Sequence, residues 1–197
     1  MRRGGGEVGT FAQNDATDRW LGRYGGMILL FTLLLAGTPQ SPVAPALAPP
    51  HAEQAPGRRF DPLVFFNGSS RGEGRLKVVL RAARLVDVRS EGHREGATLV
   101  LEQRVMEEGE RPRTRTWRIR EVAPGRYTGT LSDAAGPVSG ETRGNRLHLS
   151  FPMKGGLKAD QWLTLAPDGQ SAHNVMKVRK LGIVVATLDE TIRRTGA

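Results

Sequence analysis

Cysteine is absent from the 197 residues of this chain, and other features that mark particular functions are missing as well. Without a thiol there can be no disulfide, no cysteine-ligated metal site and no thiol nucleophile. Only 38% of the residues are hydrophobic, which excludes a polytopic membrane protein. Phosphate-binding glycine loops, dinucleotide fingerprints and Gly-x-Ser-x-Gly elbows are also missing. We therefore expect no cofactor, and a binding protein rather than an enzyme.

The N-terminal part of the chain predicts export. Residues 1–26 are polar, glycine-rich and basic, and they precede the apolar run 27–36. That run is too short for a bilayer, which takes roughly 20 apolar residues, but it matches the roughly 7–15 residues of a signal-peptide core. We interpret 1–48 as a signal peptide or N-terminal extension and 49–59 as a Pro/Ala-rich linker. A true start at Met27 would weaken this interpretation, because it would remove the basic region.

The tripeptide Leu35-Ala36-Gly37 resembles the start of a bacterial lipobox, in which a cysteine receives the lipid. Thr38 occupies the position of that cysteine and cannot be acylated there. A chance Leu-Ala-Gly after an apolar run is the alternative explanation. Either way, we expect a protein of the periplasm or cell envelope that carries no lipid anchor.

From Phe60 onward, apolar and polar residues alternate in short runs separated by turn residues, which is typical of antiparallel strands with one wet face. This pattern favours an antiparallel sheet closed on itself over a parallel sheet buried on both faces. Strands are expected at 75–81, 84–91, 97–107, 114–122, 126–132, 137–142, 145–153, 160–166, 171–179 and 183–194. Helix should be minor, with one turn at 61–66 plugging an end. Residues 60–195 are thus predicted to form one all-β barrel of about 8–10 strands.

Several short motifs occur in the same order as in a known bacterial family. They include Phe60–Gly68, Gly72-Glu-Gly74, Arg115-x-Trp117-x-Ile119, Asp160-x-Trp162, Asn174 and Lys180-x-Gly182. Together they resemble the bacterial envelope proteins of domain-of-unknown-function family 3833, many of which carry a true lipobox. The resemblance implies a lipocalin-like (calycin-type) up-and-down β-barrel with a suggested role in handling lipid. The chain departs from the family at Thr38 and at Val175, where the pattern has an arginine.

A hairpin predicted around Gly109 brings candidate ligand-binding residues together. If residues whose numbers sum to about 217 face each other, Glu102 lies opposite Arg115 and shares a face with Trp117. An ion pair inside a small barrel is costly to desolvate, so its presence there would suggest a role in ligand recognition or in fixing the strand register. The alternative is a structural ion pair at the rim of the barrel. We take Arg115 as the anchor for an acidic headgroup or carboxylate, because a guanidinium binds planar anions bidentately.

Trp117 and Trp162 are candidates for a cavity wall, although aromatic residues of a small sheet protein are more often plain core. Asp160 shares a face with Trp162 and is a candidate second interior carboxylate, with a strand-start cap as its alternative role. In a lipid-modifying enzyme, Glu102 or Asp160 would be the general acid or base. The histidines are widely separated, so no metal site is expected.

The formal net charge of +9 does not indicate nucleic-acid binding. Removing 1–48 takes away four arginines and three acidic residues and leaves +8. The remaining cations lie singly at alternate strand positions, whereas a nucleic-acid groove has clustered cations with exposed aromatics. We expect as partner a lipid or other apolar small molecule, with an anionic membrane surface as a further partner. A structural or partner-binding protein with a filled barrel is the remaining alternative.

Overall fold

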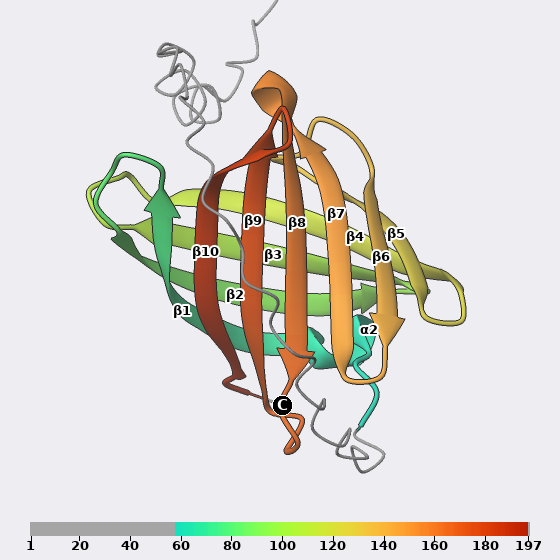
Figure 1. The fold of residues 1–197 in the computed structure, drawn as a ribbon. Helices are drawn as coiled ribbons and strands as arrows, with labels where there is room; N and C mark the ends of the chain where they lie inside the picture. Colours follow the sequence, from blue (N-terminus) through green and yellow to red (C-terminus); the bar gives the residue numbers. More distant parts are fainter. Residues whose placement is uncertain (1–57, 197) are drawn as a thin grey trace, which may run out of the picture.

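The computed structural model describes residues 58–196, which form a closed β-barrel (Figure 1). Ten antiparallel strands follow one another around the barrel, and β1 pairs with β10 to close it. The prediction of an all-β, antiparallel, lipocalin-like up-and-down barrel with minor helix is confirmed. The predicted signal peptide, Thr38 and most of the linker lie outside the described residues, so export and the missing anchor stay predictions.

The elements follow one another in a simple meander. They are α2 (Pro62–Phe65), β1 (Gly68–Val78), β2 (Arg84–Glu95), β3 (Thr98–Glu107), β4 (Arg113–Ala123), β5 (Arg126–Leu131), β6 (Val138–Arg143), β7 (Arg146–Met153), the short 3₁₀ turn η1 (Lys154–Gly156), β8 (Leu157–Leu165), β9 (Ser171–Lys180) and β10 (Ile183–Arg194). None of the helical elements within residues 58–196 has the length and hydropathy needed to cross a membrane.

The first strand begins at Gly68, seven residues before the expected start at 75. The cause lies in the inward positions of β1, which are taken by Ser70, Gly72 and Gly74 before the first apolar residue, Leu76. The apolar half of the alternation is therefore missing from the first part of the strand. A strand whose inner face is small and polar gives no periodic signal, although its backbone pairs normally with both neighbours.

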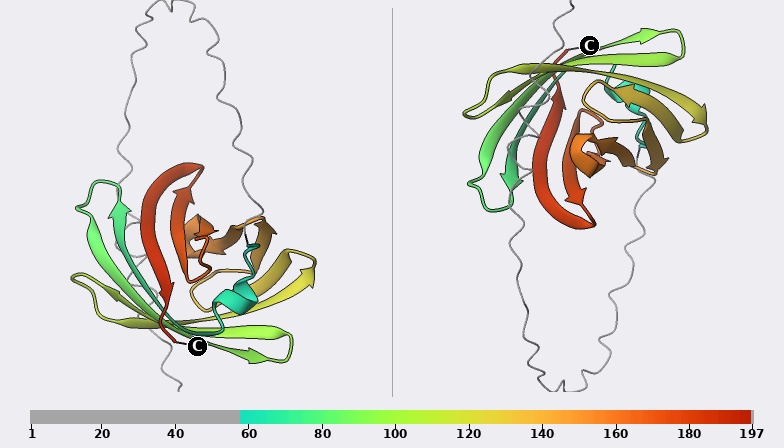
Figure 2. Two further views of the ribbon diagram at one scale, coloured as in Figure 1. Left: turned by 90° about the horizontal axis from the view of Figure 1, so that it is seen from below. Right: turned by 90° about the horizontal axis from the view of Figure 1, so that it is seen from above.

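One end of the barrel is closed by the segment 60–66, as expected, and α2 lies inside the ring of strands there (Figure 2). The Asp61 carboxylate accepts the Leu63 N–H at 2.9 Å, so α2 is capped at its start. Phe60, Phe65 and Phe66 pack on one another with ring centroids 4.8 to 6.5 Å apart. We call this the closed end.

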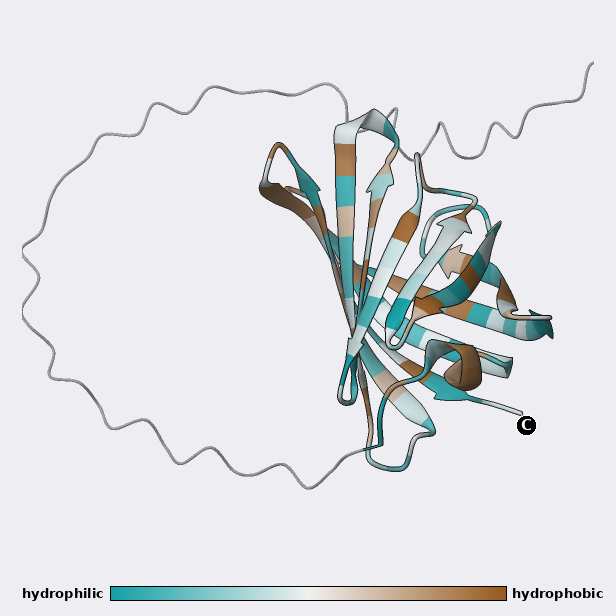
Figure 3. Ribbon diagram, turned by 90° about the vertical axis from the view of Figure 1, so that its right-hand side faces the viewer, coloured by the Kyte–Doolittle hydropathy of each residue, from teal (hydrophilic) through white to brown (hydrophobic). Residues whose placement is uncertain are grey.

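The interior is filled mainly by apolar side chains, which alternate with polar ones along each strand (Figure 3). Leu99, Leu147 and Ala159 are completely inaccessible to solvent. The opposite end of the barrel carries the connections β1–β2, β3–β4, β5–β6, β7–β8 and β9–β10, since successive strands of a meander alternate in direction. We call this the open end, because α2 lies at the other one.

Replacing Phe60 with alanine should lower the free energy of unfolding by about 3–5 kcal/mol, because the ring is fully buried in the cluster that closes the barrel. Urea unfolding followed by tryptophan fluorescence measures the change. Val64→Ala is the matched control in the same segment 60–66, since Val64 is 60% exposed and its variant should lose well under about 1 kcal/mol. Equal losses in the two variants would show that the plug does not stabilise the barrel.

Candidate ligand-binding site

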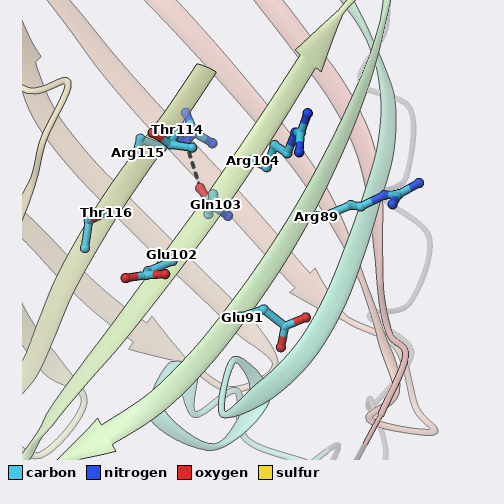
Figure 4. A pocket seen from close by; sticks show the side chains of 8 residues that line it. All are labelled: Arg89, Glu91, Glu102, Gln103, Arg104, Thr114, Arg115 and Thr116. Carbon is cyan, nitrogen blue, oxygen red and sulfur yellow. Dashed lines mark hydrogen bonds between the residues drawn. The ribbon is translucent and has the colours of Figure 1, made fainter. Parts of the chain in front are cut away.

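Arg115 and Trp117 lie on the inner face of β4, as the sequence predicts for a site inside the barrel. Both side chains donate to a single acceptor, the Gln103 side-chain oxygen on β3. The Arg115 Nε–H bond is 2.7 Å long and the Trp117 Nε1–H bond 2.8 Å. The Gln103 amide group in turn donates to the Ser90 hydroxyl on β2 at 3.0 Å. Gln103 therefore fixes the positions of both candidate residues. Its hydrogen bond with Arg115 is drawn in Figure 4.

The predicted pairing of Glu102 with Arg115 is wrong by one residue. Gln103 is the residue opposite Arg115, and Glu102 lies opposite Thr116 on the outer face. The hairpin does centre on Gly109, but a turn centred on that residue pairs Val105 with Arg113, one step from the predicted register. A shift of one residue moves every side chain to the other face of a strand. The interior partner of Arg115 is thus a neutral amide instead of a carboxylate.

Arg115 carries its positive charge in an unusual environment. Burial and the nearby Arg113 guanidinium lower the pKa of Arg115 to about 10, while Asp133 and Glu190 act in the opposite direction. The group therefore remains protonated at neutral pH. Its guanidinium carbon lies 5.7 Å from the centre of the Trp117 ring, within cation–π range. Among residues 58–196, Gln103 is its hydrogen-bond partner, which leaves both terminal Nη groups available.

Glu190 on β10 is an interior carboxylate that the sequence reasoning missed. It is 4% exposed, and its Oε2 accepts a hydrogen bond from the Asn174 amide at 2.8 Å. Gly72 on β1 makes room for it, because a β-carbon there would overlap the Glu190 carboxylate. Burial raises the pKa of Glu190, and the Asn174 hydrogen bond and the charge of Arg115 offset only part of that rise. The alternation Leu188-x-Glu190-x-Ile192 contains the signal, a carboxylate on an apolar face.

The polar groups form one wall of the interior. Ser70 pairs with Ser90, Ser90 with Gln103 and Gln103 with Arg115, so these residues make a continuous row across β1 to β4. The buried Ser70 hydroxyl and the buried Asn174 side-chain oxygen have no hydrogen-bond partner in the described part of the chain. Buried polar groups are almost always paired, so unpaired ones on the inner face of the barrel that also holds a charged guanidinium suggest a ligand that completes the set.

The remaining wall, made by β5 to β8, is mainly apolar, with Thr142 and Gln161 as its polar members. Phe151 on β7 contacts Trp117 edge-to-face at 5.4 Å between ring centres. Its neighbours on this wall include Tyr127, Leu131, Val138, Leu149 and Leu163. A barrel with one polar and one apolar wall suits a molecule that has both kinds of surface.

Asp160 and Trp162 share a face, as predicted, but it is the outer face of β8. The inner positions of that strand are held by Ala159, Leu163 and Leu165, all buried in the core. Trp162 stacks on the His148 ring at 4.9 Å, and Asp160 accepts a hydrogen bond from Arg179 at 2.9 Å. The interior position predicted for these two residues is wrong, because Asp160 is buried by side chains lying along the outside of the barrel.

Glu102 borders a shallow hollow of about 360 Å³ on the outer side of β2 to β4 (Figure 4). Arg89, Glu91 and Arg104 supply most of its other charges. Exposed charges of both signs interact weakly in water, and every residue that lines the hollow is charged or polar. Within residues 58–196, no group of three or more His, Asp or Glu side chains could hold a metal ion.

Solved structures with a similar fold include the following two. An S-type phycobiliprotein lyase, CPES from Guillardia theta, superposes with a TM-score of 0.56 at 8% identity, covering 68% of this chain and 91% of its own. Rv2717c from M. tuberculosis superposes with a TM-score of 0.54 at 16% identity, covering 69% and 99%. At these identities the likeness concerns the fold alone.

No curated protein matches the sequence. The model of one family, described as a protein of unknown function, DUF3833, does match it over residues 46–194. That match covers most of the chain and nearly all the residues that the structure describes. The resemblance noted in the sequence is confirmed: the chain belongs to the DUF3833 family.

Proposed function

We propose that the barrel binds one small, largely apolar molecule with an acidic group, such as a fatty acid or another acidic lipid. Arg115 holds the acidic group. The observation that carries the proposal is that Arg115 lies inside the barrel, is fixed through Nε by a neutral amide, and keeps both Nη groups available. A guanidinium in this state offers two parallel N–H bonds to a carboxylate or phosphate.

The rest of the interior supports an apolar partner for the same molecule. The wall formed by β5 to β8 would receive the hydrocarbon part, and Trp117 with Phe151 would lie beside the acidic group. Small antiparallel barrels can enclose one ligand of this size. The lipocalin-like fold shared with solved barrels is consistent with this role.

The proposal also includes export to the periplasm or cell envelope without a lipid anchor. Its support is the apolar run 27–36 after a basic segment, and Thr38 at the position of the lipobox cysteine. Mass spectrometry of lipids that copurify with the protein from its native envelope is the direct test. Recovery of an acidic lipid in stoichiometric amount is the expected result, and recovery of no ligand would contradict the proposal.

Arg115→Gln should weaken binding of radiolabelled oleate by roughly 10- to 100-fold, because a hydrogen bond to a charged group contributes about 1.5–3 kcal/mol. Binding of methyl oleate, which has no carboxylate, should change little. Arg118→Gln is the matched control, since Arg118 lies on the outer face of the same strand. Circular dichroism establishes that each variant is folded. Equal oleate affinity in the wild type and in Arg115→Gln would refute the role of Arg115.

A second candidate function is an enzyme that acts on the bound lipid through Glu190. The observation in its favour is the buried carboxyl group whose pKa is raised, the state required of a general acid near neutral pH. One protein of similar fold is a phycobiliprotein lyase. Conversion of bound lipid over time, absent in Glu190→Gln, would distinguish the enzyme from the simple binder. A lipid that stays chemically unchanged would favour the binder.

Glu190→Gln should stabilise the protein at neutral pH. Because the pKa of Glu190 is raised on folding, its contribution to stability is full below the unfolded pKa and is lost as the pH rises through the folded pKa. Glutamine keeps the acceptor for Asn174 without the charge. The unfolding free energies of the two proteins, measured in urea, should converge as the pH is lowered toward about 4, near the unfolded pKa of glutamate. A difference in unfolding free energy between the two proteins that grows as the pH is lowered would contradict the raised pKa of Glu190.

A further inference from the structure

Large apolar side chains are exposed together at the open end of the barrel. Leu80 in the β1–β2 connection and Leu181 in the β9–β10 turn are each 90% exposed, and Ile183 is 70% exposed. Val79 and Val184 complete this group, which we call the apolar rim. Single exposed apolar residues are ordinary, but several gathered on two adjoining tips mark an interaction surface.

The two tips adjoin because β1 and β10 are hydrogen-bonded neighbours. The Val79 N–H donates to the Val185 carbonyl oxygen at 3.0 Å, which carries the pairing of the two strands up to the rim. The β9–β10 tip projects beyond the barrel and is coloured hydrophobic (Figure 3). The apolar rim is therefore one surface contributed by two hairpins.

Both leucines at the tips have a backbone conformation that disfavours leucine. Leu80 has φ of 61° and Leu181 has φ of 50°, and every other positive-φ residue in the described part of the chain is glycine. Glycine, asparagine and aspartate are the usual residues in this left-handed region. Leucine there is strained, and it buries almost nothing against the protein. The folded barrel gains no stability from these side chains, so their role is contact with something outside it.

Basic residues lie in and beside the apolar rim, whereas on its other side the Glu108 carboxylate accepts the Leu85 N–H at the start of β2 at 3.1 Å. Lys77 and Arg81 flank the first tip, Lys180 precedes the second, and Lys154 lies in the β7–β8 connection, which is next along the edge of the barrel. The segments 77–83, 153–158 and 179–186 contain no acidic residue.

The other two connections at the open end differ from these three. Glu108 and Glu110 lie between β3 and β4 together with Arg111, and Asp133 lies between β5 and β6. The acidic residues of the connections at the open end are thus confined to these two, and the three that form or adjoin the apolar rim carry only cations. Apolar tips with cations beside them match a bilayer that contains anionic lipids, where the tips enter the acyl boundary and the cations meet the headgroups.

We propose that the apolar rim docks the open end of the barrel on an anionic membrane surface. This inference rests on the proposed function in one respect, because docking there would bring the barrel to the source of an apolar acidic ligand. The residues that carry it are separate from Arg115 and its partners. Docking and ligand binding can therefore be tested independently.

The absence of cysteine from the chain gives a clean experiment on the full-length protein. A single cysteine introduced as Ile183→Cys is labelled with the environment-sensitive dye NBD. Vesicles of phosphatidylcholine with phosphatidylglycerol should shift its emission to shorter wavelength and increase the intensity, whereas phosphatidylcholine alone should have a much weaker effect. Val122→Cys is the matched control, because Val122 is 51% exposed and lies near the β4–β5 turn at the closed end. Its dye should report no change.

The pair Leu80→Asn and Leu181→Asn, added to the labelled protein, should weaken vesicle binding by at least about tenfold, because two leucine side chains would no longer enter the bilayer. Thermal stability should stay the same or rise, since asparagine tolerates a positive φ. Arg115→Gln should dock as well as the wild type, which separates failure of docking from failure of ligand binding. Unchanged dye emission at position 183, or undiminished docking by the asparagine pair, would overturn the proposal. So would a dimer that the asparagine pair dissociates when no vesicle insertion occurs, because the rim would then be a self-association surface.

Discussion

The Gln103 side-chain oxygen accepts from both Arg115 and Trp117, and the interior site depends on this shared contact. A charged guanidinium inside a barrel loses its hydration, which costs free energy. A carboxylate partner would offset that cost by forming an ion pair with it. A neutral acceptor orients Arg115 without cancelling its charge. The opposed Glu190 does not compensate fully, because its raised pKa favours the uncharged form. An incoming anion would therefore meet a cation that is fixed in place and lacks an ion pair.

The small residues of β1 have a direct part in this arrangement. Gly72 and Gly74 leave no side chains on the inner face, and Glu190 from the neighbouring β10 occupies the space. Any larger residue at 72 would push the carboxylate toward the centre of the barrel or displace the strand. The two glycines therefore leave room for a side chain that comes from another strand. In this way a Gly-x-Gly motif can shape a site without contributing a side chain to it.

Periodicity predicted the closed antiparallel barrel and its ten strands because alternation is a local property that each strand carries in its own residues. Register is different, because it depends on which residue lies at the centre of a turn. The predicted partner of Arg115, Glu102, differs from the observed partner, Gln103, by one residue of register. Alternation alone does not say which face of β8 is the inner one, and Trp162 on the same face as Asp160 indicates the wrong face. Glu190 was missed although its strand contains the signal, because the glycines that accommodate it lie more than a hundred residues earlier.

The residues at the closed end of the barrel stabilise the fold, whereas several residues inside the barrel and at the open end do not. This difference indicates where the functional surfaces lie. At the closed end the helix is capped, the phenylalanines are packed, and the turn positions of positive φ at 96, 125, 144 and 169 are all glycine. Each of these choices stabilises the fold. Inside the barrel a cation pairs with a neutral amide, and at the open end leucines occupy strained, exposed positions. Such departures from stability are typical of functional sites. The closed end holds the barrel together so that the rest can bear these costs.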